Sequence, residues 1–143
     1  MRNQVYYEDL AEGSEIPSLV KHPTTQQLVR WAGASGDYNP IHYDKDFARS
    51  KGFNEVIAQG ALVASFLGQL LTDWVGEGGS VRKLTCRYKE ISLPGRDIVC
   101  RGKVTKKYIE NEEHCVECSL WAENPDGEKA VIGTAIFTLP SCP

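Results

Sequence analysis

The chain has 143 residues, a net charge of -3 at pH 7 and five cysteines. A single domain of this length buries roughly 70% of the surface that the unfolded chain exposes, so it needs no disulfide or metal to hold its fold. The mild negative charge, the scattered basic residues and the lack of a signal-like or membrane-spanning stretch indicate a cytoplasmic protein that binds neither nucleic acid nor membranes.

The first half of the chain predicts two short helices. A capping sequence, TTQQ at 24–27, precedes apolar residues at helical spacing, so we expect a helix over residues 25–34 that ends at Gly36. The stretch DKDFARSKG at 44–52 predicts a further helical turn, which Gly52 closes.

Residues 59–75, QGALVASFLGQLLTDWV, predict a longer and buried helix. Large apolar residues recur every four positions in two adjacent rows: Leu62, Phe66, Leu70 and Trp74, and Val63, Leu67, Leu71 and Val75. A third row is small and consists of Gly60, Ala64 and Gly68. Because a glycine inside a helix costs on the order of 1 kcal/mol, we expect a strand, a partner subunit or a ligand chain to pack closely there.

From residue 80 onward the apolar pattern changes to period two, which predicts successive strands. They are expected at 81–93, 97–109, 114–123 and 129–139, with a turn at Pro94-Gly95 and a hairpin turn at 124–127. Four strands after a buried helix predict an antiparallel sheet around that helix, an α+β fold. Cys115 and Cys118 should point to opposite faces of their strand, so we expect neither a metal site nor a cofactor.

The loop SGDYNPIH at 35–42 places a carboxylate and an imidazole five residues apart. Neither a helix nor a strand points residues with this spacing toward each other, so Asp37 and His42 can meet only in a curled loop. Gly36 and Pro40 favour such a loop. The residues alone allow either a surface turn with a solvated histidine or a shared site. In both cases a turn location leads us to expect that Asp37→Asn and His42→Ala leave the thermal midpoint nearly unchanged.

Residues 36–42, GDYNPIH, resemble the hydratase motif G-D-x-N-P-[LIV]-H of the MaoC-like family. This family includes (R)-specific enoyl-CoA hydratases and bacterial 3-hydroxyacyl-acyl-carrier-protein dehydratases. The resemblance extends over IAQGALVASFLGQLL at 57–71 and over the strands that follow. It implies one hot-dog domain over residues 1–143, with a curved antiparallel sheet wrapped around one long central helix. Gln59 stands where many relatives have His, and Gly68 where some carry a polar side chain that supports the catalytic Asp.

The resemblance also implies a hydro-lyase that reversibly hydrates trans-2-enoyl thioesters to (R)-3-hydroxyacyl thioesters. Asp37 and His42 are the expected catalytic residues, because together they can hold one water and transfer its proton. The N–H of Gly60 is the expected oxyanion donor, and the first amides of a helix are free for this purpose. Asn39 is expected to fix the loop or the carboxylate through its amide.

The expected substrate is a thioester of coenzyme A or of an acyl-carrier protein, and the expected partner is a second copy or another hot-dog subunit. Two further functions stay open. A hot-dog thioesterase would direct water at the thioester carbonyl and release the thiol. A non-catalytic acyl-binding subunit of a hetero-oligomer is the other, although binding alone needs neither Asp37 nor His42.

Overall fold

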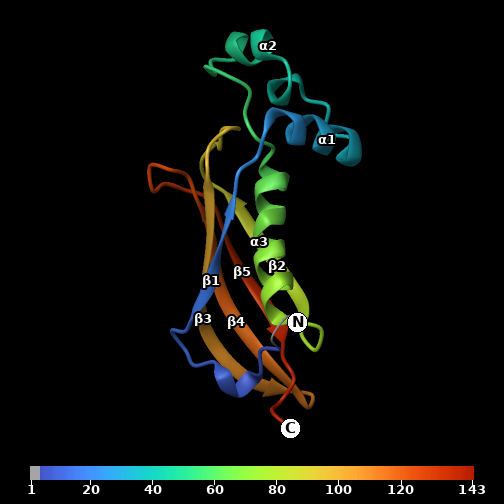
Figure 1. Cartoon of the computed structure of the whole chain (residues 1–143), viewed down its shortest axis with the longest axis vertical. Coiled ribbons are helices and arrows are strands. Elements are labelled where there is room, and N and C mark those ends of the chain that lie inside the picture. Colours follow the sequence, from blue (N-terminus) through green and yellow to red (C-terminus); the bar gives the residue numbers. More distant parts are fainter. Residues whose placement is uncertain (1–3) are drawn as a thin grey trace.

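The computed structural model of the protein describes residues 4–143. Five antiparallel strands form one curved sheet in the order β1-β3-β4-β5-β2, and a long helix runs along it (Figure 1). The strands are β1 (Glu15–Lys21), β2 (Ser80–Tyr88), β3 (Ile98–Glu110), β4 (Glu113–Glu123) and β5 (Lys129–Thr138). The expected α+β hot-dog architecture is confirmed.

Four of these strands are the predicted ones, and β1 is an addition. Its sequence, EIPSLVK, contains Pro17, and the pairing of β1 with β3 shifts register between Ile16 and Leu19. Proline is tolerated on an edge strand or at a bulge but breaks the alternation by which strands are recognised. The strand expected over 81–93 ends earlier, because the amides of Lys89 and Glu90 both donate to the carbonyl oxygen of Ala130.

The first short helix begins at the predicted residue and ends one position later, and the second lies within the predicted stretch 44–52 but ends at Ser50, before Gly52. Helix α1 (Thr25–Ser35) is capped by the hydroxyl of Thr24, which accepts from the amide of Gln27, and it ends at Gly36 with φ of 77°. Helix α2 (Lys45–Ser50) is capped in the same way by Asp44. Single 3-10 turns, η1 (Tyr7–Asp9) and η2 (Pro40–His42), complete the helical elements. Helices α1 and α2 lie together beyond one end of the sheet (Figure 1).

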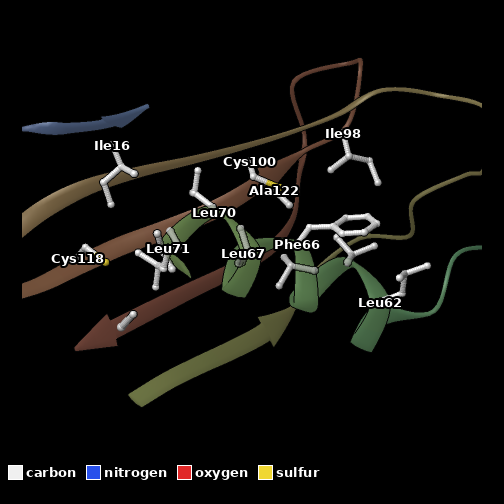
Figure 2. Packing of buried hydrophobic residues seen from close by; sticks show 14 of the residues in the cluster. Ile16, Leu62, Phe66, Leu67, Leu70, Leu71, Ile98, Cys100, Cys118 and Ala122 are labelled. Atoms are coloured by element: carbon white, nitrogen blue, oxygen red, sulfur yellow. The ribbon is translucent and has the colours of Figure 1, made fainter. Parts of the chain in front are cut away.

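Helix α3 (Gly60–Val75) forms the centre of the core and packs against all five strands. Both of its predicted apolar rows are buried except at Trp74, which is partly exposed. Figure 2 shows this packing, in which the apolar side chains of α3 meet the inner face of the sheet. From the sheet come Ile16, Ile98, Cys100, Cys118 and Ala122.

The small row of α3 lies against strand β2. A Cβ atom on Gly60 would lie 3.2 Å from the ring of Tyr88, and one on Gly68 would lie 3.7 Å from a methyl group of Leu84. We expected a strand, a partner subunit or a ligand chain to pack against this row. The structure shows that a strand, β2, does so.

The five cysteines are free thiols. Cys118 belongs to the core cluster whereas Cys115 does not, in line with their expected placement on opposite faces of β4. Within residues 4–143, no three side chains of His, Cys, Asp or Glu gather as potential metal ligands. Over the same part of the chain, no helix is long and apolar enough to cross a membrane.

Candidate active site

The loop after α1 curls through local hydrogen bonds. Gly36 adopts the left-handed conformation that ends the helix, and the carboxylate of Asp37 then accepts from the amide of Asn39 over 3.3 Å. The side-chain oxygen of Asn39 accepts in turn from the amide of Ile41, also over 3.3 Å, and so caps η2. The side chain of Asn39 thus caps η2, and its backbone N–H rather than its side chain reaches the carboxylate, while its expected role in the site stays a prediction.

This loop brings Asp37 and His42 together. The carboxylate oxygen Oδ2 of Asp37 lies 3.6 Å from Nε2 of His42, with 45% of the Asp37 side chain exposed but only 8% of the His42 side chain. Hydrogen bonds from a ring N–H to a carboxylate are shorter, about 2.7–3.2 Å, so the two groups face each other without a direct bond. The interpretation as a surface turn with a solvated histidine is wrong. The catalytic role of the pair stays a prediction.

The other ring nitrogen of His42 determines how the pair can act. Nδ1 lies 2.7 Å from the carbonyl oxygen of Ile57. A carbonyl only accepts hydrogen bonds, so Nδ1 carries the proton, and in the neutral ring Nε2 then presents a lone pair to Asp37. The amide of Ile57 donates to the carbonyl oxygen of Ile41 over 3.0 Å. The loop is thus tied twice to the segment that leads into α3.

The first turn of α3 forms the other side of the site. Gly60 is the first residue of the helix, and its amide belongs to the group that has no partner inside the helix and lies at the positive end of its dipole. Gln59 precedes it without capping the helix, because its side-chain nitrogen donates to the carbonyl oxygen of Leu28 in α1 over 2.8 Å. The ring of Tyr88 covers Gly60 from β2.

Two features of this site, the carbonyl of Ile57 and the ring of Tyr88, have weak or no signals in the sequence, whereas a third, Gln59, has one. The carbonyl of Ile57 is a backbone group and leaves no trace in residue type. Tyr88 continues the alternating apolar pattern of its strand, so nothing in the sequence indicates that it lies beside Gly60. Gln59 had a usable signal, since it is a polar residue inside the otherwise apolar run IAQGALV. Gly68 has no side chain to support Asp37, which is held by its own loop instead.

Comparison with known proteins identifies the family of this chain. A family model described as "MaoC like domain" matches residues 13–124. The chain belongs to the MaoC-like family. Among its members, an (R)-specific enoyl-CoA hydratase of Rhodospirillum rubrum is 30% identical over 116 residues, which cover 77% of this chain and 80% of the relative. A 3-hydroxybutyryl-CoA dehydratase of Methylorubrum extorquens is 27% identical over 139 residues, 95% of this chain and 85% of the relative.

Solved structures of the MaoC-like family share the fold. The R-hydratase PhaJ1 from Pseudomonas aeruginosa matches with a TM-score of 0.88 and 25% identity, over 97% of this chain and 88% of that one.

Proposed function

We propose that this MaoC-like protein is a hydro-lyase that reversibly hydrates trans-2-enoyl thioesters to (R)-3-hydroxyacyl thioesters without a cofactor. The observation that carries the proposal is the 3.6 Å separation between Asp37 Oδ2 and an Nε2 whose lone pair is left free by the bond from His42 Nδ1 to Ile57. The activities that name the relatives, enoyl-CoA hydratase and 3-hydroxybutyryl-CoA dehydratase, support the same reaction class.

Two acceptors that face each other suit one bound water. A water molecule has two O–H groups and can donate one hydrogen bond to the imidazole and one to the carboxylate. As its oxygen adds to C3 of the substrate, Nε2 of His42 accepts one proton, and the pair returns a proton to C2 from the same side. Acid–base assistance of this kind contributes about 10²–10⁴-fold to the rate.

The negative charge that develops on the thioester oxygen needs a donor as well. The amide of Gly60 is the proposed donor, because it is free in the first turn of α3 and no side chain of its own stands in the way. Loss of one such donor costs about 10²–10³ in rate.

The substrate is a thioester of coenzyme A or of an acyl-carrier protein, and the protein acts in the cytoplasm as a homodimer or with a second hot-dog subunit. The position of strand β2 favours an oligomer, because β2 forms one edge of the sheet and its outer row of backbone groups can pair with a strand of another subunit. A monomeric mass at micromolar concentration would contradict this part of the proposal.

The test offers the purified protein 2-enoyl-CoAs of short and long chain in deuterated water, with ultraviolet absorbance and free thiol followed together. We expect the absorbance of the conjugated double bond to disappear without thiol release, and crotonyl-CoA to give (R)-3-hydroxybutyryl-CoA with deuterium at C2. Thiol release would instead indicate a thioesterase, and the (S) product would refute the proposed stereochemistry. If the protein neither converts the substrate nor releases thiol, the remaining function is that of a non-catalytic acyl-binding subunit.

A further inference from the structure

Gln59 is buried directly before the first residue of α3, with 1% of its surface exposed. Its side-chain nitrogen donates to the carbonyl oxygen of Leu28, and this acceptor fixes which end of the amide is the nitrogen. Its side-chain oxygen is buried too and has no hydrogen-bond partner within the described residues. A buried acceptor without a partner destabilises the folded state.

The bond to Leu28 is not needed to satisfy that carbonyl. Leu28 lies inside α1, where helical geometry already gives its oxygen the N–H of the residue four positions later. An apolar side chain of similar length at position 59 would fill the same space and leave no acceptor unpaired. For stability alone Gln59 is therefore an unfavourable residue, and a buried unpaired polar group in a native protein calls for another explanation.

The two elements that Gln59 joins carry the two halves of the proposed site. Helix α1 continues through Gly36 into Asp37, and Gln59 is followed by Gly60. Two residues earlier, Ile57 holds the ring of His42. The segment 57–59 thus holds His42 through Ile57 and holds α1, the helix that leads into Asp37, through the bond from Gln59 to Leu28.

The same bond leaves the first turn of α3 open. The residues that precede α1 and α2, Thr24 and Asp44, each place a side-chain oxygen on an amide of the helix that follows. Gln59 makes no such bond, since its side chain is directed to Leu28. The side chain of Gln59 therefore occupies none of the first amides of α3, which include the proposed donor Gly60.

We infer that Gln59 is a positioning residue: its amide clamps α1 to the start of α3 and so sets the position of Asp37 and His42 relative to the amide of Gly60. This inference rests on the proposed hydratase function. A misplacement of about 1 Å can cost about 10²-fold in rate. Loss of the clamp should therefore appear in kcat, with little change in KM or stability.

Gln59→Met and Gln59→Glu test the clamp, and the same two substitutions at Gln26, on the exposed surface of α1, serve as matched controls. We expect Gln59→Met to keep or raise the thermal midpoint, because it removes the unpaired acceptor, while kcat for crotonyl-CoA or the preferred enoyl-CoA falls about tenfold or more. The Gln26 variants should match the wild type in both measurements.

Gln59→Glu adds a pH-dependent readout that a purely structural role would not give. A protonated carboxyl group has an O–H that can donate to Leu28, whereas a carboxylate has none. Burial favours the neutral form and raises the pKa of such a carboxyl above its ordinary value. On samples that circular dichroism shows to be folded, kcat of Gln59→Glu relative to wild type should fall as the pH rises, whereas the ratio for Gln59→Met should stay flat.

Each outcome decides the inference. A Gln59→Met variant with wild-type kcat overturns it and leaves the proposed function intact, provided that the wild type hydrates the substrate. A variant that cannot fold shows a structural role and overturns it too. A wild-type protein that hydrates no 2-enoyl-CoA defeats the proposed function, and the inference with it.

Discussion

Replacement of His42 by Asn and by Ala distinguishes the structural role of Nδ1 from the proposed catalytic role of Nε2. Nδ1 donates to the carbonyl of Ile57 over 2.7 Å, and Nε2 faces Asp37 at 3.6 Å. The amide nitrogen of Asn can take the place of Nδ1, but Asn has nothing at the position of Nε2. We therefore expect His42→Asn to keep the fold and lose the reaction, and His42→Ala to weaken both.

The burial of His42 sets the size of the effect. With 8% of the side chain exposed, Ala leaves the carbonyl of Ile57 without its donor, which costs about 1–3 kcal/mol, and adds a small cavity. At roughly 4 °C per kcal/mol for a chain of this length, the midpoint should fall by about 10 °C. The sequence-based expectation of an unchanged midpoint is thus revised for His42. It stands for Asp37→Asn, whose side chain is 45% exposed.

Thermal unfolding followed by circular dichroism gives the midpoints, and the loss of enoyl absorbance gives the turnover. Both His42 variants and Asp37→Asn should be slower by at least about 10²-fold, the lower limit for a lost acid–base group. An Asn variant with near wild-type turnover would refute the assignment of Nε2 as the base. An Ala variant that melts with the wild type would refute the structural role of the bond to Ile57.

Three further predictions concern the site, the core and the thiols. Gly60→Ala should lower kcat by about tenfold or more, since its methyl group would press on the ring of Tyr88 at 3.2 Å, and Tyr88→Ala should restore part of the loss. Gly102→Ala should cost about 1–3 kcal/mol in urea unfolding, because the added methyl would lie 2.7 and 2.8 Å from two core side chains. Burial raises the thiol pKa of Cys100 and of Cys118 from 9.0 to about 12. Unfolded thiols lose their protons first, so the contribution of these two thiols to the free energy of unfolding should be fully present below about pH 9 and be lost toward pH 12, and the double Ala variant should lose less stability over this range than the wild type.

The sequence predicts the fold well wherever the pattern of side chains reports burial directly. The sequence indicates helix α3 because two apolar rows recur along it, and helix α1 because Thr24 and Gly36 provide its N-terminal and C-terminal caps. The sequence does not indicate strand β1, because Pro17 and a bulge interrupt its alternation and only Ile16 of its seven residues is buried. Its place in the sheet is decided by pairing with β3, far away in the chain.

The site divides in the same way. The meeting of Asp37 and His42 could be expected because Gly36 and Pro40 favour a curled loop. The burial of His42 could not, since it depends on a segment that begins more than ten residues later and supplies the carbonyl of Ile57. The tautomer of the ring, and with it the nitrogen that presents a lone pair to Asp37, is thus fixed by a backbone group that no residue type encodes.

The difference in exposure within the pair bears on the stereochemistry of the proposed reaction. His42 is enclosed while nearly half of the Asp37 side chain reaches solvent, so in the proposed reaction we expect water and substrate to approach the pair from the side of Asp37. Because the bond from Nδ1 to Ile57 holds the ring in place, Nε2 cannot turn to serve the opposite face of a double bond. The hydroxyl group and the proton must then arrive on one face, and deuterium at C2 should lie syn to the new hydroxyl. Anti addition would be compatible with the family but not with a single water shared by these two side chains.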